Sequence, residues 1–254
     1  TFDSKAAREK VSYLIYLPSD YGTATAQRYP VVYWLHGIGG SQQGVPQMAE
    51  RLTKAIAEKK TPPMIVVYVN GMINSGYSDG RHPVESVTIK ELIPHVDATY
   101  RTIATRDGRI IEGFSMGGGG AAKWGFNYTE LFGTVSILAG ALSSGGRSSE
   151  KSEGAAKTKQ VSERSGVEEN NPWTLVEKNA DKIRGRTVVR IAVGGKDGLV
   201  GTNTRYHELL DKLRIEHDFD IVPDAPHSPN PVYEGLGDKN WAFWRKALAR
   251  VSGK

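Results

Sequence analysis

Short runs of β-branched and apolar residues alternate along this chain with segments of helical period, and this alternation constrains the fold more than any other feature. Residues 64–69 (MIVVYV) are almost continuously apolar, as expected for a strand covered on both faces. Asn171 and Pro172 form a recognisable helix start, with an N-cap followed by proline at the first helical position. The alternation predicts an α/β fold with a mostly parallel central sheet and helices on both faces. Strands are expected at residues 11–17, 31–35, 64–69, 109–113, 134–138, 188–193 and 219–222, and helices at 45–58, 86–99, 117–126, 172–183, 203–213 and 239–250.

Composition narrows the class of protein. Hydrophobic residues make up 39% and charged residues 24%, which is typical of a globular chain, and we expect one domain over residues 1–254. The absence of cysteine excludes a disulfide framework, thiolate metal sites and a cysteine nucleophile. The net charge of +5 is spread as single basic residues among acids, so no nucleic-acid partner is expected. No apolar stretch approaches the roughly 20 residues that cross a membrane, so no membrane partner is expected either.

Two segments stand apart from the α/β pattern. Residues 143–170 are rich in Ser, Gly, Lys and Glu with almost no apolar residue, which predicts a polar, flexible surface excursion. This excursion is either an inserted loop or a lid over the site. The chain opens on Thr1-Phe2-Asp3 without a signal segment, and we expect a secreted or periplasmic protein from which a signal peptide has been removed.

The pattern G-x-S-x-G, in which a serine occupies a sharp turn between a strand and a helix, occurs twice. In residues 113–117 (GFSMG) the serine is Ser115, which follows an extended run and precedes a series of small residues suited to a closely packed helix. In residues 76–80 (GYSDG) the serine is Ser78, and the Arg-His-Pro that follows disfavours a helix directly after it. The context predicts Ser115 as the nucleophile and Ser78 as a loop residue.

A serine nucleophile at such a turn requires an acid and then a histidine further along the chain. His227 follows the last expected strand, in a proline-rich loop at the sheet edge from which a base can reach the serine. His207 falls within a helical pattern and His217 lies between two acids, so both are interpreted as packed or surface residues. Asp197 is the first acid after the preceding strand and is predicted to orient the base. Asp224 is the main alternative and is expected to make a local turn contact.

Two backbone N–H groups are needed to hold an oxyanion. One is expected from Met116, the residue after the nucleophile, and the other from Ile38 in the glycine-rich run 36–40 (HGIGG) that follows a strand. His36 is interpreted as a structural loop residue rather than a second base. Loops at the same sheet edge are expected to bring pocket residues to the substrate: Tyr77, Ser78, Asp79 and Tyr233.

Several motifs together resemble one family of enzymes. They are residues 28–37 (RYPVVYWLHG), 91–97 (ELIPHVD) and 113–118 (GFSMGG), and His227 with the later Trp241 and Trp244. On these residues the chain resembles the esterase family of α/β-hydrolases, which includes feruloyl esterases, acetylxylan esterases, S-formylglutathione hydrolases and mycolyltransferases. The resemblance runs from about residue 13 to the C-terminal helix. It implies an α/β-hydrolase fold and a secreted bacterial enzyme that cleaves ester-linked acyl groups from plant polysaccharide.

The chain departs from this family in places. Four consecutive glycines follow Met116, and the polar excursion has no counterpart in the family pattern. The cysteine expected in the oxyanion region of S-formylglutathione hydrolases is absent, which argues against that subgroup.

The sequence therefore predicts two-step acyl transfer by Ser115, His227 and Asp197 on an acylated polysaccharide or oligosaccharide, with no metal or organic cofactor. Feruloyl and acetyl substrates both remain open, as does the oligomeric state. Two alternatives are an acyltransferase of the same fold and a non-catalytic carbohydrate-binding relative.

Overall fold

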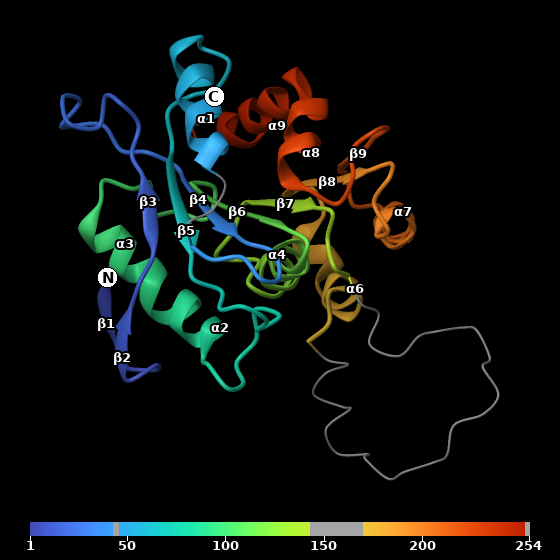
Figure 1. The fold of residues 1–254 in the computed structure, drawn as a ribbon, viewed down its shortest axis with the longest axis horizontal. Helices are drawn as coiled ribbons and strands as arrows, with labels where there is room; N and C mark the ends of the chain where they lie inside the picture. Colours follow the sequence, from blue (N-terminus) through green and yellow to red (C-terminus); the bar gives the residue numbers. More distant parts are fainter. Residues whose placement is uncertain (43–45, 143–169, 252–254) are drawn as a thin grey trace.

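The computed structural model describes residues 1–42, 46–142 and 170–251. Its centre is a seven-stranded sheet, which Figure 1 shows with helices packed around it. Six of the strands are parallel, and only the first, β3 (Leu14–Tyr16), runs antiparallel to its neighbour β5 (Ile65–Val69). Residues 31–35 and 65–69 are buried at every position, which explains their continuous apolar sequences. The order across the sheet is β3 (Leu14–Tyr16), β5 (Ile65–Val69), β4 (Val31–Leu35), β6 (Arg109–Phe114), β7 (Thr134–Leu138), β8 (Val188–Gly194) and β9 (Asp218–Val222).

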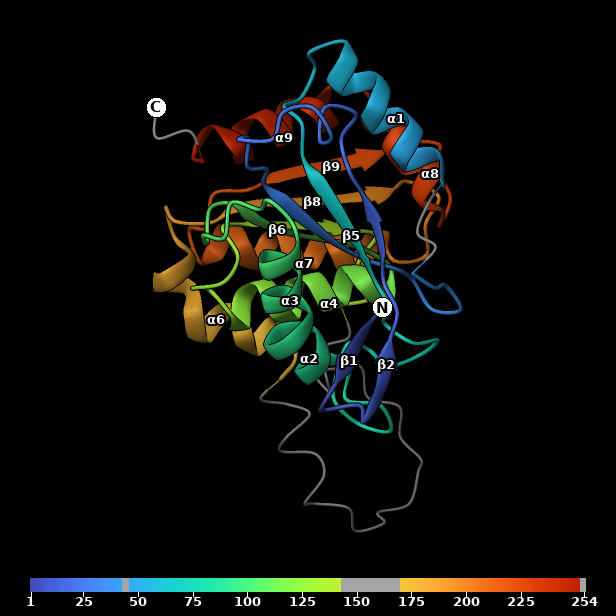
Figure 2. The same ribbon diagram turned by 90° about the vertical axis from the view of Figure 1, so that its left-hand side faces the viewer.

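Helices cover both faces of this sheet (Figure 2). Between the sheet and the helices, each face has its own apolar core. One face carries α1 (Pro46–Ala57), α8 (Pro229–Leu236) and α9 (Asp238–Ala249). The other carries α2 (Val84–Val87), a π-helical turn (Thr88–Leu92), α3 (Ile93–Thr99), α4 (Met116–Asn127), α6 (Pro172–Ile183) and α7 (Val200–Lys212). A small antiparallel pair, β1 (Phe2–Ser4) and β2 (Glu9–Val11), lies beside α2 and α3. None of the helices in the described ranges is long and apolar enough to span a membrane.

Most expected elements are present, with shifted ends. The helix at 172–183 is confirmed, and the Asn171 side chain caps it by accepting a hydrogen bond from the Thr174 N–H at 3.0 Å. The strand expected at 11–17 is wrong in extent, because only Leu14–Tyr16 pair with β5. The helix α8 was not predicted, because the two prolines of its first turn favour a loop. The first turn of a helix nevertheless tolerates proline. The polar excursion lies almost wholly outside the described residues.

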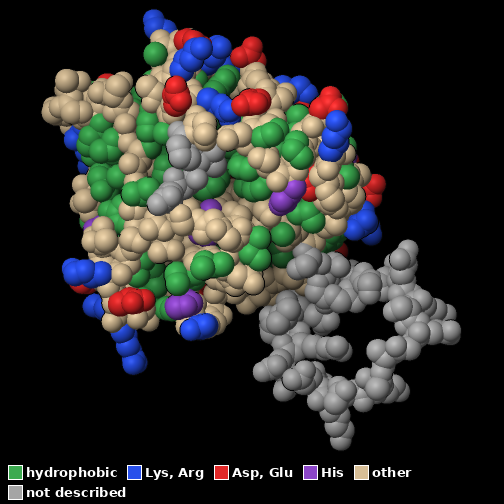
Figure 3. Space-filling model, viewed as in Figure 1, with side chains coloured by type: hydrophobic (Ala, Val, Ile, Leu, Met, Phe, Trp, Pro, Cys, Tyr) green, Lys and Arg blue, Asp and Glu red, His purple; other side chains and the backbone are tan. Residues whose placement is uncertain are grey.

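Surface charge on the face seen in Figure 3 is mixed, with Lys and Arg side chains interspersed with Asp and Glu rather than gathered into one basic block. The sheet determines where a functional site can lie. Because the strands are parallel, the loops after β4, β5, β6, β7, β8 and β9 all leave from the same edge.

Candidate active site

Ser115 occupies the turn between β6 and α4 in a backbone conformation that few non-glycine residues adopt, with φ 59° and ψ −117°. The turn requires glycine two residues to either side. A Cβ at Gly113 would lie 2.1 Å from the Gly117 carbonyl oxygen, and a Cβ at Gly117 would lie 2.0 Å from the Leu35 carbonyl oxygen. The spacing of the motif is therefore a steric requirement of the turn.

Ser115, His227 and Asp197 come together at the sheet edge from three different loops. The Ser115 Oγ lies 2.8 Å from His227 Nε2, and His227 Nδ1 lies 2.6 Å from Asp197 Oδ2. Asp197 is buried, and its second oxygen accepts a hydrogen bond from the Leu199 N–H at 2.8 Å. With the carboxylate held in this way, the Nδ1–H donates to Asp197 and Nε2 is left to accept the serine proton.

The surroundings fix this geometry further. The Phe114 ring packs against the His227 ring with centroids 4.9 Å apart. The Ser115 carbonyl accepts hydrogen bonds from Gly119 and Ala141 N–H groups at 3.0 and 2.8 Å. Asn203 binds both backbone groups of Gly140 at 3.0 Å and so holds the loop after β7 in place. This role of Asn203 was not predicted, because an asparagine within a helical pattern gives no indication of its distant partner.

The glycine-rich loop after β4 lies against the serine. A Cβ built on Gly37 would stand 3.3 Å from the Ser115 Cβ, so the loop that carries Ile38 borders Ser115. The His36 side chain holds this loop in place. Its Nε2 accepts a hydrogen bond from the Gly71 N–H at 3.0 Å, and its Nδ1 lies 2.8 Å from the Gly37 carbonyl oxygen. Burial lowers the pKa of His36, which keeps its ring neutral. These contacts confirm the structural interpretation of His36.

Ser78, in the second G-x-S-x-G pattern, has different partners. Its hydroxyl lies 2.7 Å from the Lys123 ammonium, which also forms an ion pair with Glu85 at 2.5 Å and donates to the Tyr77 carbonyl at 2.7 Å. Ser78 therefore contacts a lysine that is held by other partners, and not a histidine. Ser78 instead lines a surface hollow of about 340 Å³ among residues 72–82, as a loop residue.

Two of the predicted substrate contacts are wrong, and a third residue forms hydrogen bonds within its own loop region. Tyr77 is fully buried, with its hydroxyl donating to the His36 carbonyl at 3.0 Å, so it supports the loop and cannot meet a substrate. Tyr233 is also buried, on the opposite face of the sheet, where its hydroxyl donates to Glu112 at 2.6 Å. Asp79 accepts hydrogen bonds from the backbone and hydroxyl of Ser86, at 3.0 and 2.6 Å, near the start of α2.

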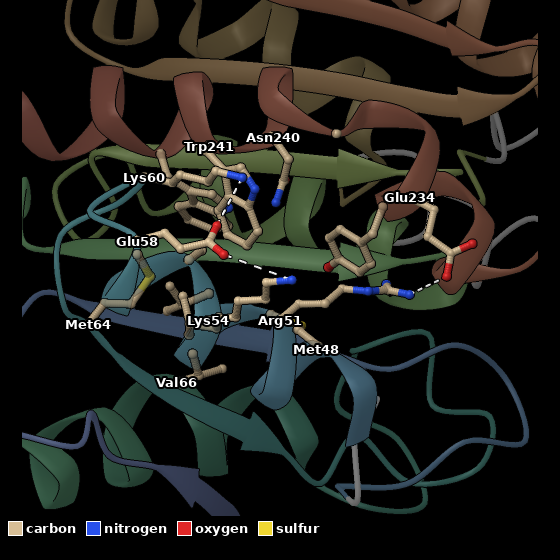
Figure 4. A pocket seen from close by; sticks show the side chains of 16 residues that line it. Met48, Arg51, Lys54, Glu58, Lys60, Met64, Val66, Glu234, Asn240 and Trp241 are labelled. Atoms are coloured by element: carbon tan, nitrogen blue, oxygen red, sulfur yellow. Dashed lines mark hydrogen bonds and ion pairs between the residues drawn. The ribbon is translucent and has the colours of Figure 1, made fainter.

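A separate cavity of about 240 Å³ lies between α1 and the pair α8–α9, on the face of the sheet away from α4 (Figure 4). Its floor is apolar, and ion pairs of Arg51 with Glu234 and of Lys60 with Glu58 stand at its rim. None of the three residues gathered at the sheet edge lines this cavity. It is therefore not the site of serine chemistry.

Comparisons with known proteins agree with this geometry. The model of the family described as "Putative esterase" matches residues 4–254. Esterase Rv1288 of Mycobacterium tuberculosis is 35% identical over 135 residues, covering 51% of this chain and 29% of that protein. The endo-1,4-beta-xylanase/feruloyl esterase of Xylanibacter ruminicola is 32% identical over 151 residues, covering 55% of this chain and 21% of that protein. The chain thus spans less than a third of the length of both curated relatives.

A solved structure of a ferulic acid esterase has a TM-score of 0.75 to this chain at 23% identity, covering 98% of this chain and 92% of that one. At this identity the likeness establishes the fold. The expected α/β fold, with its mostly parallel sheet and helices on both faces, is confirmed.

Proposed function

This chain belongs to the esterase family whose model it matches over residues 4–254, and from that membership we propose that it is a serine carboxylic-ester hydrolase with Ser115 as nucleophile. One observation carries the proposal: an unbroken chain of contacts from Ser115 through His227 to buried Asp197, at 2.8 and 2.6 Å. A serine hydroxyl needs such a partner because it is a weak nucleophile until a base removes its proton.

In the first half of the reaction, the Ser115 oxygen attacks the ester carbonyl while His227 Nε2 takes its proton. The negative charge that develops on the carbonyl oxygen is held by the N–H groups of Met116 and Ile38. Met116 is the first residue of α4, where backbone N–H groups point out of the helix towards an anion. The protonated His227 then gives its proton to the leaving alcohol, and an acyl-enzyme remains.

In the second half, His227 removes a proton from water, which attacks the acyl-enzyme and releases the carboxylic acid. Asp197 holds the imidazole in the tautomer that both halves require and stabilises the imidazolium. Because Asp197 is 3% exposed and His227 is reachable from solvent, the acid is shielded while the base can meet water.

For the substrate we propose feruloyl or acetyl groups on plant cell-wall polysaccharide, and secretion as the setting in which such a polymer is met. The support is indirect: one relative is named a xylanase/feruloyl esterase and a solved structure of the same fold is a ferulic acid esterase. Two exposed apolar side chains would suit an aromatic acyl group: Ile38 is 62% exposed and Ile73 is 70% exposed. A hydrogen bond from the Gly39 N–H to the Ile73 carbonyl joins their two loops.

The test is hydrolysis of 4-nitrophenyl acetate and methyl ferulate by the wild type, Ser115→Ala and Ser78→Ala. The Ser78 variant is the matched control, because it removes the serine of the other G-x-S-x-G pattern. We expect Ser115→Ala to lose activity by about 10⁵-fold or more, and Ser78→Ala to keep it. The ester that the wild type hydrolyses with the higher kcat/KM distinguishes feruloyl from acetyl substrates. Activity that survives in Ser115→Ala would reject the nucleophile, and acyl transfer to an added alcohol in preference to water would indicate a transferase.

A further inference from the structure

Two histidines meet at the surface well outside the candidate active site. His207 lies in α7, and His217 directly precedes β9. The Nδ1 of His207 lies 2.7 Å from the Nε2 of His217. Asp211, one helical turn after His207, places a carboxylate oxygen 3.5 Å from the other nitrogen of that ring. One ligand atom from each of the three side chains lies within 4.8 Å of the others, and no second such group exists among the described residues.

The contacts of the two rings turn one nitrogen of each towards the same gap. His217 Nδ1 lies 2.7 Å from the Ile215 carbonyl, which only accepts, so this nitrogen carries the hydrogen and Nε2 faces His207 as a lone pair. Since His217 Nε2 is then an acceptor, the 2.7 Å contact is a hydrogen bond in which His207 Nδ1 supplies the hydrogen. A metal ion that displaces this hydrogen would have both nitrogens as ligands. A metal-binding histidine is usually held in this way, with its other nitrogen donating to a carbonyl or carboxylate.

The site is held firmly and remains open to solvent. The His207 ring stacks on Phe219 with centroids 4.2 Å apart and an angle of 12°. The His207 side chain is 27% exposed and that of Asp211 is 63% exposed, so an ion can enter. The neighbouring carboxylates of Glu216 and Asp218 are drawn away by Lys246, at 3.3 and 3.2 Å.

We propose that His207, His217 and Asp211 form a binding site for a divalent transition-metal ion of the zinc type. Two imidazoles and one carboxylate are a donor set that suits zinc, with water in the fourth position. Two nitrogens on a tetrahedral zinc, each at about 2.0 Å, lie about 3.3 Å apart, so the rings need only separate by about 0.6 Å. Asp211 becomes a ligand by turning its exposed carboxylate from His207 Nε2 towards the ion, which is within reach because one ligand atom of each of the three side chains lies within 4.8 Å of the others.

The bound ion joins α7 to the beginning of β9. Asp197 lies in the loop before α7, and His227 lies in the loop after β9. The ion therefore links the two elements whose adjoining loops supply both partners of the nucleophile. His217 lies at the other end of β9 from His227, away from the sheet edge where the ester would react. The ion therefore stabilises the fold and takes no part in the chemistry.

The test is titration of the untagged protein, after dialysis against EDTA, with ZnCl₂ in a calorimeter, for the wild type, His207→Gln and His217→Gln. His82→Gln is the matched control, because His82 is a partly exposed histidine outside the cluster. We expect one ion per wild-type chain, at least about tenfold weaker binding in each cluster variant, and unchanged binding in the control. Saturating zinc should raise the melting temperature of the wild type by about 2–4 °C and leave both cluster variants unmoved.

Wild-type protein that binds no zinc would overturn the proposal, and would mean that the two rings share a proton only. Binding of equal strength in both cluster variants would also overturn it, and would move the ion to another site such as His227 with Asp197. Circular dichroism of the variants separates loss of binding from loss of fold.

Discussion

A buried ion pair between β6, the strand that precedes Ser115, and β8 supports a quantitative prediction. Glu112, three residues before Ser115, forms an ion pair with Arg190 of β8 at 2.7 Å, and both side chains are at most 1% exposed. The remaining oxygen of Glu112 accepts the Tyr233 hydroxyl at 2.6 Å, and Ser136 donates to the first at 2.7 Å. The perturbation is Glu112→Gln, which keeps the shape of the side chain and removes its charge.

The variant leaves the Arg190 guanidinium buried without a counter-charge. Removing one partner of a buried pair costs about 3–5 kcal/mol in the free energy of unfolding. The remaining partners of Arg190 are neutral: Asn240 at 2.7 Å, Ser136 at 3.1 Å and the Phe243 ring at 4.1 Å. At about 2–4 °C per kcal/mol for a chain of this size, the melting temperature should fall by about 6–20 °C.

The assay is urea denaturation followed by circular dichroism, with calorimetry for the melting temperature. The double variant Glu112→Met with Arg190→Met should be less destabilised than Glu112→Gln alone, because it leaves no buried charge. Asp224→Asn breaks an exposed pair with Lys196 and serves as the control, with an unchanged midpoint. A midpoint for Glu112→Gln that matches this control would refute the reasoning.

Three further predictions follow from the described contacts. Asp197→Asn should lower kcat by about 10⁴-fold with an unchanged circular dichroism spectrum, since the tautomer of the base is lost; a loss below tenfold would contradict this role. Gly117→Ala should destabilise the fold by about 3 kcal/mol or more, because its Cβ would lie 2.0 Å from the Leu35 carbonyl oxygen, whereas Gly22→Ala, with nothing within 4 Å, should match the wild type in urea. Burial lowers the pKa of His36 below 6.5, so the unfolded chain takes up a proton before the folded one as pH falls. Stability should therefore decrease below about pH 6.5, and urea midpoints at about pH 5 and pH 7.5 should differ less in His36→Gln than in the wild type.

The sequence was informative where a local pattern has one steric or topological meaning. The glycines of residues 113–117 are required by the turn itself, so the motif predicts the turn at Ser115 without knowledge of the rest of the fold. The order of strands and helices then places the loops that carry Asp197 and His227 at the same sheet edge. Local propensity also predicted the Asn171 cap.

The sequence was uninformative where a side chain's direction depends on distant partners. Tyr77 turns inward because Gly120 leaves room for its ring: a Cβ there would lie 2.6 Å from the ring carbon Cδ2. Glu112 and Arg190 are separated by 78 residues, and nothing near either one indicates its partner. The burial of Tyr233 follows from α8, a helix whose prolines favoured the interpretation as a loop.

The identity of the nucleophile is tested most directly by covalent labelling with a fluorophosphonate, followed by peptide mapping in a mass spectrometer. Such reagents react with a serine only where a base activates it, so they distinguish Ser115 from Ser78 in one experiment. We predict a single adduct per chain, on the peptide that contains Ser115, and no adduct in His227→Ala. An adduct on Ser78, or ester hydrolysis by a chain in which Ser115 stays unlabelled, would contradict the account.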